Sequence, residues 1–247
     1  NYLAGRRVGD PNNHPIVPWV MDFTSRNGGL RDLTKSKYRL EKGDDQLDYT
    51  YTSAREEAWR CNEKEGSTPH HIGNISTDVT YYVYMARRTC REVLCSRVRP
   101  QWVPGEYPGS MERMYKWSPD ECIPEFFTDP LLFRSIHPDL PDLAIPTWCG
   151  SPEELVSVHR GVLEGDHVSA HLHRWIDLMF GFQLAGDAAY KSKNVYLTLV
   201  DNHTSLHCSG VVQLFRSTHP KRAMGTCAPL ALLEWQTYLT QSSVATE

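Results

Sequence analysis

The first 38 residues place opposing demands on the backbone. Pro11, Pro15 and Pro18 lie close together and are followed by Gly28-Gly29, and prolines at this density forbid a long helix. The residues between and after them are nevertheless too apolar to lie on a protein surface. They are Ile16, Val17, Trp19, Val20 and Phe23. We therefore predict extended, irregular backbone that is buried, with its carbonyl groups paired to neighbouring elements.

Helical patterns dominate the later part of the chain. Ser151, Pro152 and the acidic residues at 153 and 154 are typical of a helix start, and this helix should end near Gly165. Apolar residues then recur at positions 172, 175, 176 and 179, on one face of a second helix that Gly181 can end. We expect these two helices to form a hairpin. Shorter helices are expected at 186–193 and 228–239, so the fold class is mainly α.

Two other segments have different compositions. Residues 35–67 are charged and contain few side chains of core size, which predicts a mobile insertion. Residues 77–85 are rich in β-branched and aromatic side chains, which favours a buried strand or extended segment.

Charge and cysteine content limit the class of protein. With 26 basic and 30 acidic residues the net charge is -4, so no global field attracts nucleic acid. No stretch approaches ~20 uncharged apolar residues, and we expect no membrane span. The 7 cysteines are odd in number and show no paired close spacing, which favours free thiols in a reducing compartment such as the cytosol.

Three blocks of sequence carry a family resemblance. Residues 1–25 contain Asn-x-x-Ala-Gly-Arg and then Pro-x-x-Pro-Trp-Val, and residues 122–127 contain Pro-Glu-Phe. Residues 145–195 contain the spaced Trp, His-Arg, Leu-His-x-Trp-Ile-Asp and Phe-Gly positions. On these blocks the chain resembles the BEACH domain family. The matching signature and core positions are Trp19, Glu125, Phe126, Trp148, His159, Arg160, Trp175 and Asp177.

The resemblance implies a multihelical BEACH domain over residues 1–222, with an irregular core of extended segments and few short strands. Residues 223–247 would then form a helix or a linker toward downstream regions. Residues 87–127 stand where common members carry a Tyr-Gly-x-x-Tyr-Ser block, which this chain lacks. The replacement narrows the resemblance to members that carry WD repeats and work on endosomes.

For those members the resemblance implies a non-catalytic scaffold, without cofactor or metal, on the cytosolic face of early and late endosomes. It would support early-to-late endosome conversion by restraining phosphatidylinositol 3-kinase activity, with a further role in autophagy of protein aggregates. The implied partners are a second WD-repeat protein, the phosphatidylinositol 3-kinase complex, autophagy adaptors and neighbouring domains of the same chain.

The strongest local charge is a run of arginines. Five of them lie within 13 residues, close to the amphipathic Trp102; they are Arg87, Arg88, Arg91, Arg97 and Arg99. On a shared exposed face they would contact an acidic partner surface or anionic lipid headgroups of the endosomal membrane. Alternatively, they form a solvated face that is partly paired with the acidic tract at 120–142. Both interpretations stay open.

A second candidate contact is the tetrapeptide that runs from Phe133 to Ile136. Its aromatic-x-x-aliphatic form is the one that ubiquitin-like autophagy modifiers bind by strand addition, with two hydrophobic pockets that give specificity. The form is common in proteins, and the run from Trp175 to Leu178 has it too, but that run is expected on a helix in the core, so only the first merits testing.

Catalytic signatures are missing, and the remaining polar candidates favour structural roles. His167 and His171 would share a helix face and could bind zinc with Glu164 or His207, but hydrogen-bonded or surface histidines are the more common case. Glu125 lies among apolar residues, so we expect an ion pair with Arg113 or Arg134 in preference to a role in lining a peptide groove. The same preference applies to Asp177, His159 and Arg160. A hydrolase or metalloenzyme using Glu125 and the histidines is the remaining alternative.

Overall fold

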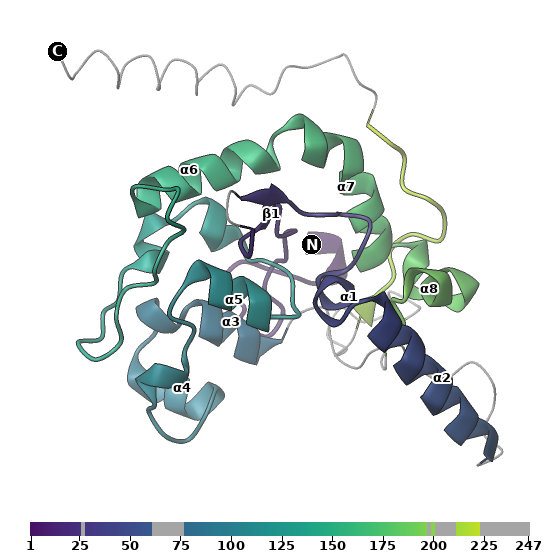
Figure 1. The fold of residues 1–247 in the computed structure, drawn as a ribbon, viewed down its shortest axis with the longest axis horizontal. Helices are drawn as coiled ribbons and strands as arrows, with labels where there is room; N and C mark the ends of the chain where they lie inside the picture. Colours follow the sequence, from purple (N-terminus) through teal and green to yellow (C-terminus); the bar gives the residue numbers. More distant parts are fainter. Residues whose placement is uncertain (26–27, 61–76, 197–198, 201–210, 223–247) are drawn as a thin grey trace.

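Helices surround an N-terminal segment that forms almost no regular structure of its own (Figure 1). The computed structural model describes residues 1–25, 28–60, 77–196, 199–200 and 211–222. Its α-helices are α1 (Lys37–Lys42), α2 (Asp44–Arg60), α3 (Asp78–Tyr84), α4 (Arg91–Arg97), α5 (Met111–Trp117), α6 (Pro152–Leu163), α7 (Asp166–Met179) and α8 (Gly186–Ser192). The mainly α prediction is confirmed.

Strands contribute little to the described part of the chain. Antiparallel β1 (Met21–Asp22) and β2 (Gly29–Leu30) form one two-stranded sheet, and parallel β3 (Leu199–Val200) and β4 (Val211–Val212) form another. Short 3-10 helices connect the other elements; they are η1 (Tyr2–Ala4), η2 (Ala86–Arg88), η3 (Pro104–Glu106), η4 (Pro124–Phe127), η5 (Pro130–Phe133) and η6 (Phe182–Leu184). No helix within the described ranges is long and apolar enough to cross a bilayer.

The proline-rich N-terminal segment is buried and extended, as predicted. Ile16 and Trp19 are fully buried, and Val17 exchanges two backbone hydrogen bonds of 2.9 Å with Cys122. The side chain of Asn1 bonds both the N–H and the C=O of Ile16 at 2.8 Å. Apart from the short β1–β2 pair, the described part of this segment has no ladder, so groups such as those of Ile16 and Val17 are satisfied individually, by the Asn1 side chain and by Cys122.

Helix α3 replaces the strand that we predicted at 77–85. Thr77 caps it by accepting a hydrogen bond from the Thr80 N–H, and Asp78 lies in the first turn, where a carboxylate complements the helix dipole. The helix places Tyr84 edge-on against Trp19, with 5.8 Å between ring centroids. The strand prediction was wrong because β-branched and aromatic residues fit a helix when capping and tertiary packing favour it.

The charged segment at 35–67 also contains more regular structure than we predicted. Residues 37–60 form α1 and α2, with Ser36 capping α1 and Leu47 buried. Lys193 holds α2 through its bonds to the Asp44 carbonyl and the Asp48 carboxylate. Figure 1 shows α2 extending away from the rest of the fold. Residues 61–67 lie outside the described residues, as does the helix predicted at 228–239.

Helices α6 and α7 begin where the sequence predicted, with a different mutual arrangement. Ser151 accepts a hydrogen bond from the Glu154 N–H, and Pro152 is the first residue of α6. Gly165 separates the two helices. They meet at a wide bend and arch over one side of the fold, so the predicted hairpin is wrong (Figure 1). The short helix predicted at 186–193 is confirmed as α8.

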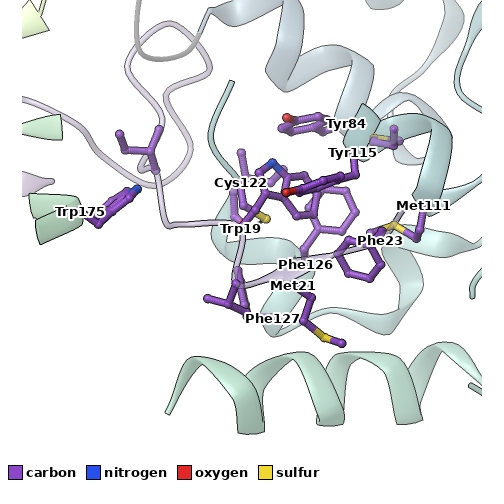
Figure 2. Packing of buried hydrophobic residues seen from close by; sticks show 14 of the residues in the cluster. Trp19, Met21, Phe23, Tyr84, Met111, Tyr115, Cys122, Phe126, Phe127 and Trp175 are labelled. Carbon is purple, nitrogen blue, oxygen red and sulfur yellow. Dashed lines mark hydrogen bonds between the residues drawn. The ribbon is translucent and has the colours of Figure 1, made fainter. Parts of the chain in front are cut away.

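The core is built around the indole of Trp19 (Figure 2). Phe126 lies at 5.1 Å and Tyr115 at 5.7 Å from it, measured between ring centroids. The His159 ring stacks on Phe127 at 3.9 Å, and its Nδ1 lies 3.2 Å from the Phe126 carbonyl oxygen. Burial lowers the pKa of His159 to about 4, so the imidazole is neutral at physiological pH.

A buried ion pair fixes the N-terminal segment to the loop after α5. Arg31 binds both carboxylate oxygens of Glu121, at 2.5 and 2.7 Å, and both side chains are almost completely buried. The same guanidinium donates to the carbonyl oxygens of Trp19 and Lys35. One cation therefore satisfies a carboxylate and two backbone acceptors of the extended segment.

We predict that Glu121→Gln lowers the free energy of unfolding by about 3 to 5 kcal/mol, because it leaves a buried guanidinium without a counter-charge. Urea denaturation measures this change. The matched control is Glu112→Gln on the exposed side of α5, which should change stability by less than about 0.5 kcal/mol. Equal stability of the two variants would contradict the role given to the ion pair.

We predict that acidification from pH 7 to pH 4.5 destabilises the wild type relative to His159→Phe by about 2 to 3 kcal/mol. The folded pKa is depressed, so the contribution of His159 is fully present above the unfolded pKa of about 6.5 and is lost as pH falls toward 4. Burial raises the pKa of Asp120 to about 6, and this carboxyl acts in the opposite direction. The effect of Asp120 is present in both the wild type and His159→Phe, so it cancels when their stabilities are subtracted. If the two plots of unfolding free energy against pH ran parallel, the prediction would be refuted.

Candidate interaction groove

The arginine run does not form one exposed face. Arg87 is buried: its Nε donates to the Pro141 carbonyl at 2.8 Å and its Nη2 donates to the Pro108 carbonyl at 3.0 Å. Burial lowers its pKa to about 10. The prediction that Arg87 contributes to an interaction surface is therefore wrong, because its bonds to two loop carbonyls hold it inside the fold.

Three of the other arginines in the run have acidic neighbours. Arg91 pairs with Asp139 at 2.5 Å, and the same carboxylate accepts the Trp102 indole N–H at 2.8 Å. Arg99 pairs with Glu106, and Arg97 lies 4.0 Å from Asp78. Only the Arg91–Asp139 pair involves the acidic tract at 120–142 that the second interpretation named; Glu106 and Asp78 lie outside it. Arg88 is exposed, with no ion pair found among the described residues.

The aromatic-x-x-aliphatic tetrapeptide is not available as a unit. Phe133 is 1% exposed and belongs to the core, whereas Ile136 is 51% exposed. Strand addition needs both apolar side chains to enter pockets of the partner. The structure therefore contradicts the use of Phe133 in this interaction.

Most of the signature residues serve the core. Trp19, Phe126, His159, Trp175 and Asp177 are buried, Trp148 packs against the core in a half-buried position, and Arg160 is exposed. Instead of an ion pair, Asp177 accepts the backbone N–H of His219 at 2.8 Å. The Cβ of any larger residue at Gly181 would lie 2.7 Å from the Asp177 Cα, so this close approach requires glycine.

Glu125 lacks the arginine partner that we predicted. Its Oε2 has no hydrogen-bond partner in the described part of the chain, and burial raises its pKa. Arg113 instead stacks on Trp117, and Arg134 lies 3.7 Å from Asp142. The residue as a whole is half-buried, but this oxygen is shielded from solvent, so the protonated carboxyl is favoured over the carboxylate.

Two histidines of α7 form hydrogen bonds with backbone carbonyl groups. His167 Nε2 lies 3.0 Å from the Arg31 carbonyl oxygen, and His171 Nδ1 lies 2.7 Å from the His167 carbonyl oxygen. Within the described ranges no group of three or more His, Cys, Asp or Glu side chains could hold a metal ion. His207 lies outside those ranges.

The structure instead contains a half-open groove that the sequence did not indicate. It encloses about 530 Å³ between the β1–β2 hairpin, α1 and α5. Leu30 and Trp117 stand at its rim, 54% and 58% exposed, while Tyr115 is buried beneath. These residues come from separate segments, and each is unremarkable in its own stretch of sequence.

Charged side chains line the same groove. Lys37 is buried, its Nζ donates to the Ser118 carbonyl at 2.8 Å, and the ammonium lies 4.2 Å from the centre of the Tyr115 ring. Burial lowers its pKa to about 8. Arg31, which is buried and paired with Glu121, together with Asp22, Asp32, Glu41 and Lys116, completes the charged lining, so carboxylates outnumber exposed cations. This composition suits recognition of a polar and apolar ligand more than covalent catalysis.

Comparison with known proteins agrees with this architecture. The profile of the Beige/BEACH domain matches residues 1–222. The chain belongs to the BEACH domain family. It is 58% identical to human WD repeat-containing protein 81 over 231 residues, which cover 92% of this chain and 12% of that protein.

More distant relatives extend the comparison. The chain is 48% identical to Suppressor of organelle fusion 2 of Caenorhabditis elegans, over 90% of this chain and 15% of that protein. It is 40% identical to the probable inactive serine/threonine-protein kinase lvsG of Dictyostelium discoideum, over 90% of this chain and 13% of that protein. The BEACH chain thus spans about an eighth of the length of the relatives that it matches.

We predict that Arg87→Lys lowers the free energy of unfolding by about 1 to 3 kcal/mol, because an ammonium cannot reproduce the spaced donors that reach two loop carbonyls. The neighbouring exchange Arg88→Lys is the control and should have an effect below about 0.5 kcal/mol, since this side chain is exposed. Chemical denaturation of both variants checks the difference. Similar stabilities would show that the buried position of Arg87 is unimportant.

Proposed function

We propose that this BEACH domain is the protein-binding part of a larger scaffold that acts on the cytosolic face of early and late endosomes. The observation that carries the proposal is 58% identity to human WD repeat-containing protein 81 over 92% of the chain. The name of the Caenorhabditis elegans relative, Suppressor of organelle fusion 2, supports a role in organelle traffic.

In the proposed role the domain acts by contact and not by catalysis. It joins a second WD-repeat protein and the phosphatidylinositol 3-kinase complex, restrains that kinase and so supports conversion of early to late endosomes. The proposed role in autophagy of protein aggregates would use adaptors bound elsewhere than at Phe133, which is buried. Much of the domain's buried polar chemistry serves backbone carbonyls and ion pairs, which is consistent with a structural scaffold.

Direct binding to anionic membrane by residues 87–99 is the alternative function. The positive electrostatic field of these residues is weakened because Arg87 is buried and because Arg91 and Arg99 are paired with carboxylates. A neutralised pair attracts anionic headgroups far less than two free cations do. For this reason we rank the membrane alternative below protein contact.

We predict that the chain, used as bait in endosome-rich extract, captures a WD-repeat protein together with phosphatidylinositol 3-kinase subunits, both identified by mass spectrometry. The test variant is Arg88→Glu/Arg97→Glu, which reverses two exposed charges without touching buried Arg87. Arg160→Glu/Arg174→Glu, on the exposed faces of α6 and α7, is the charge-matched control. Flotation with acidic liposomes is measured in parallel.

Capture of both protein classes by the wild type without flotation supports the scaffold. Salt-sensitive flotation that is lost in Arg88→Glu/Arg97→Glu, with no WD-repeat protein captured, overturns it in favour of membrane binding, because headgroup attraction is screened by salt.

A further inference from the structure

The groove between the β1–β2 hairpin, α1 and α5 has the size and lining of a site for a short peptide segment. Its volume of about 530 Å³ lies within the range of ligand pockets. The rim residues Leu30 and Trp117 are more than half exposed, although both are large and apolar. Arg113 stacks on the Trp117 indole at 3.9 Å, which holds this rim residue in place.

The charge of the groove selects for a cation. Arg31 is neutralised by Glu121, whereas the Lys37 ammonium keeps its charge but is buried against a carbonyl and an aromatic ring. Lys116 is then the exposed basic side chain of the lining, against the carboxylates of Asp22, Asp32 and Glu41. A basic side chain of a ligand would find a complementary field here.

Two polar atoms of the lining residues lack partners. Glu41 Oε2 is shielded from water and accepts no hydrogen bond from the described residues, and its other oxygen is 3.4 Å from Lys42. Arg31 is 1% exposed, and its Nε likewise has no acceptor in the described part of the chain. Both atoms are shielded from solvent, so a basic head in the groove would instead reach the partly exposed side of the Glu41 carboxylate, where it would compete with Lys42.

We propose that this groove binds an extended segment of a partner protein in which a lysine or arginine precedes a bulky apolar residue. The basic head would pair with Glu41, supported by Asp22 and Asp32, and the apolar side chain would pack between Leu30 and Trp117. This proposal rests on the proposed function, because it names the chemistry of a partner that a scaffold recognises.

The test uses fluorescently labelled octapeptide pools that are degenerate apart from one fixed central dipeptide. The fixed dipeptides are Lys-Leu, Arg-Leu, Glu-Leu and Lys-Ser, and binding to the 247-residue chain is followed by fluorescence anisotropy. We expect the Lys-Leu and Arg-Leu pools to bind about tenfold more tightly than the other two, since a charge-assisted bond or a buried apolar side chain contributes on this scale.

Glu41→Gln keeps the shape of the side chain and removes its charge. We expect it to weaken binding of the Lys-Leu pool about tenfold. Glu57→Gln, in an exposed position on α2 away from the groove lining, makes the same charge change and should alter affinity less than about twofold. Circular dichroism confirms that each variant is folded.

A second measurement needs no variant that perturbs binding. The indole ¹⁵N–¹H resonance of Trp117, assigned through Trp117→Phe, should shift when the Lys-Leu pool is added to the wild type. Equal binding of all four pools, no binding of any pool, an unchanged affinity of Glu41→Gln or a stationary Trp117 resonance would each overturn the proposal. If Glu41→Gln still captures the WD-repeat protein from extract while the peptide pools fail to bind, the groove proposal falls and the scaffold function stands.

Discussion

The buried bond between Arg31 and Glu121 is the interaction on which the arrangement of this domain depends. An extended chain inside a core has carbonyl and amide groups that no helix or sheet satisfies. Arg31 donates to the carbonyls of Trp19 and Lys35 while it binds Glu121. Cys122, the residue after Glu121, exchanges two backbone bonds with Val17, which lies just before Trp19 in the sequence. Together they hold the Trp19 ring where the helices can pack around it.

The segment from Trp175 to Gly181, which contains the family's Trp-Ile-Asp and Phe-Gly positions, holds irregular chain in a similar way. Asp177 binds the His219 N–H, and the Phe180 carbonyl accepts from Leu214 and Phe215. Gly181 is needed because its backbone approaches that of Asp177 too closely for a side chain. Asp177 and Gly181 thus fasten irregular chain to the end of α7, a task that requires these residue types at these positions.

Sequence alone predicted the parts of this fold that depend on local rules. Ser151 and Pro152 specify the start of α6. In the first segment the prolines specify extended chain, and the apolar residues between them specify burial. It failed where the deciding contact is distant. Arg87 and Arg88 are adjacent and identical in type, yet only Arg87 meets the carbonyls of Pro108 and Pro141, 21 and 54 residues away. The groove was missed for the same reason, because its walls come from three separate stretches of chain.

The same internal pairing also bears on how the domain recognises other molecules. Arg91, Arg99 and Arg31 are each matched with a carboxylate, so the many charges of the sequence produce little long-range field. Recognition must then depend on contact at short distance, where unpaired groups and exposed apolar side chains coincide. The wall that contains Glu41, Leu30 and Trp117 meets that condition, whereas the arginine run largely does not. A scaffold with matched charges would discriminate partners by the fit of a segment and not by their overall charge.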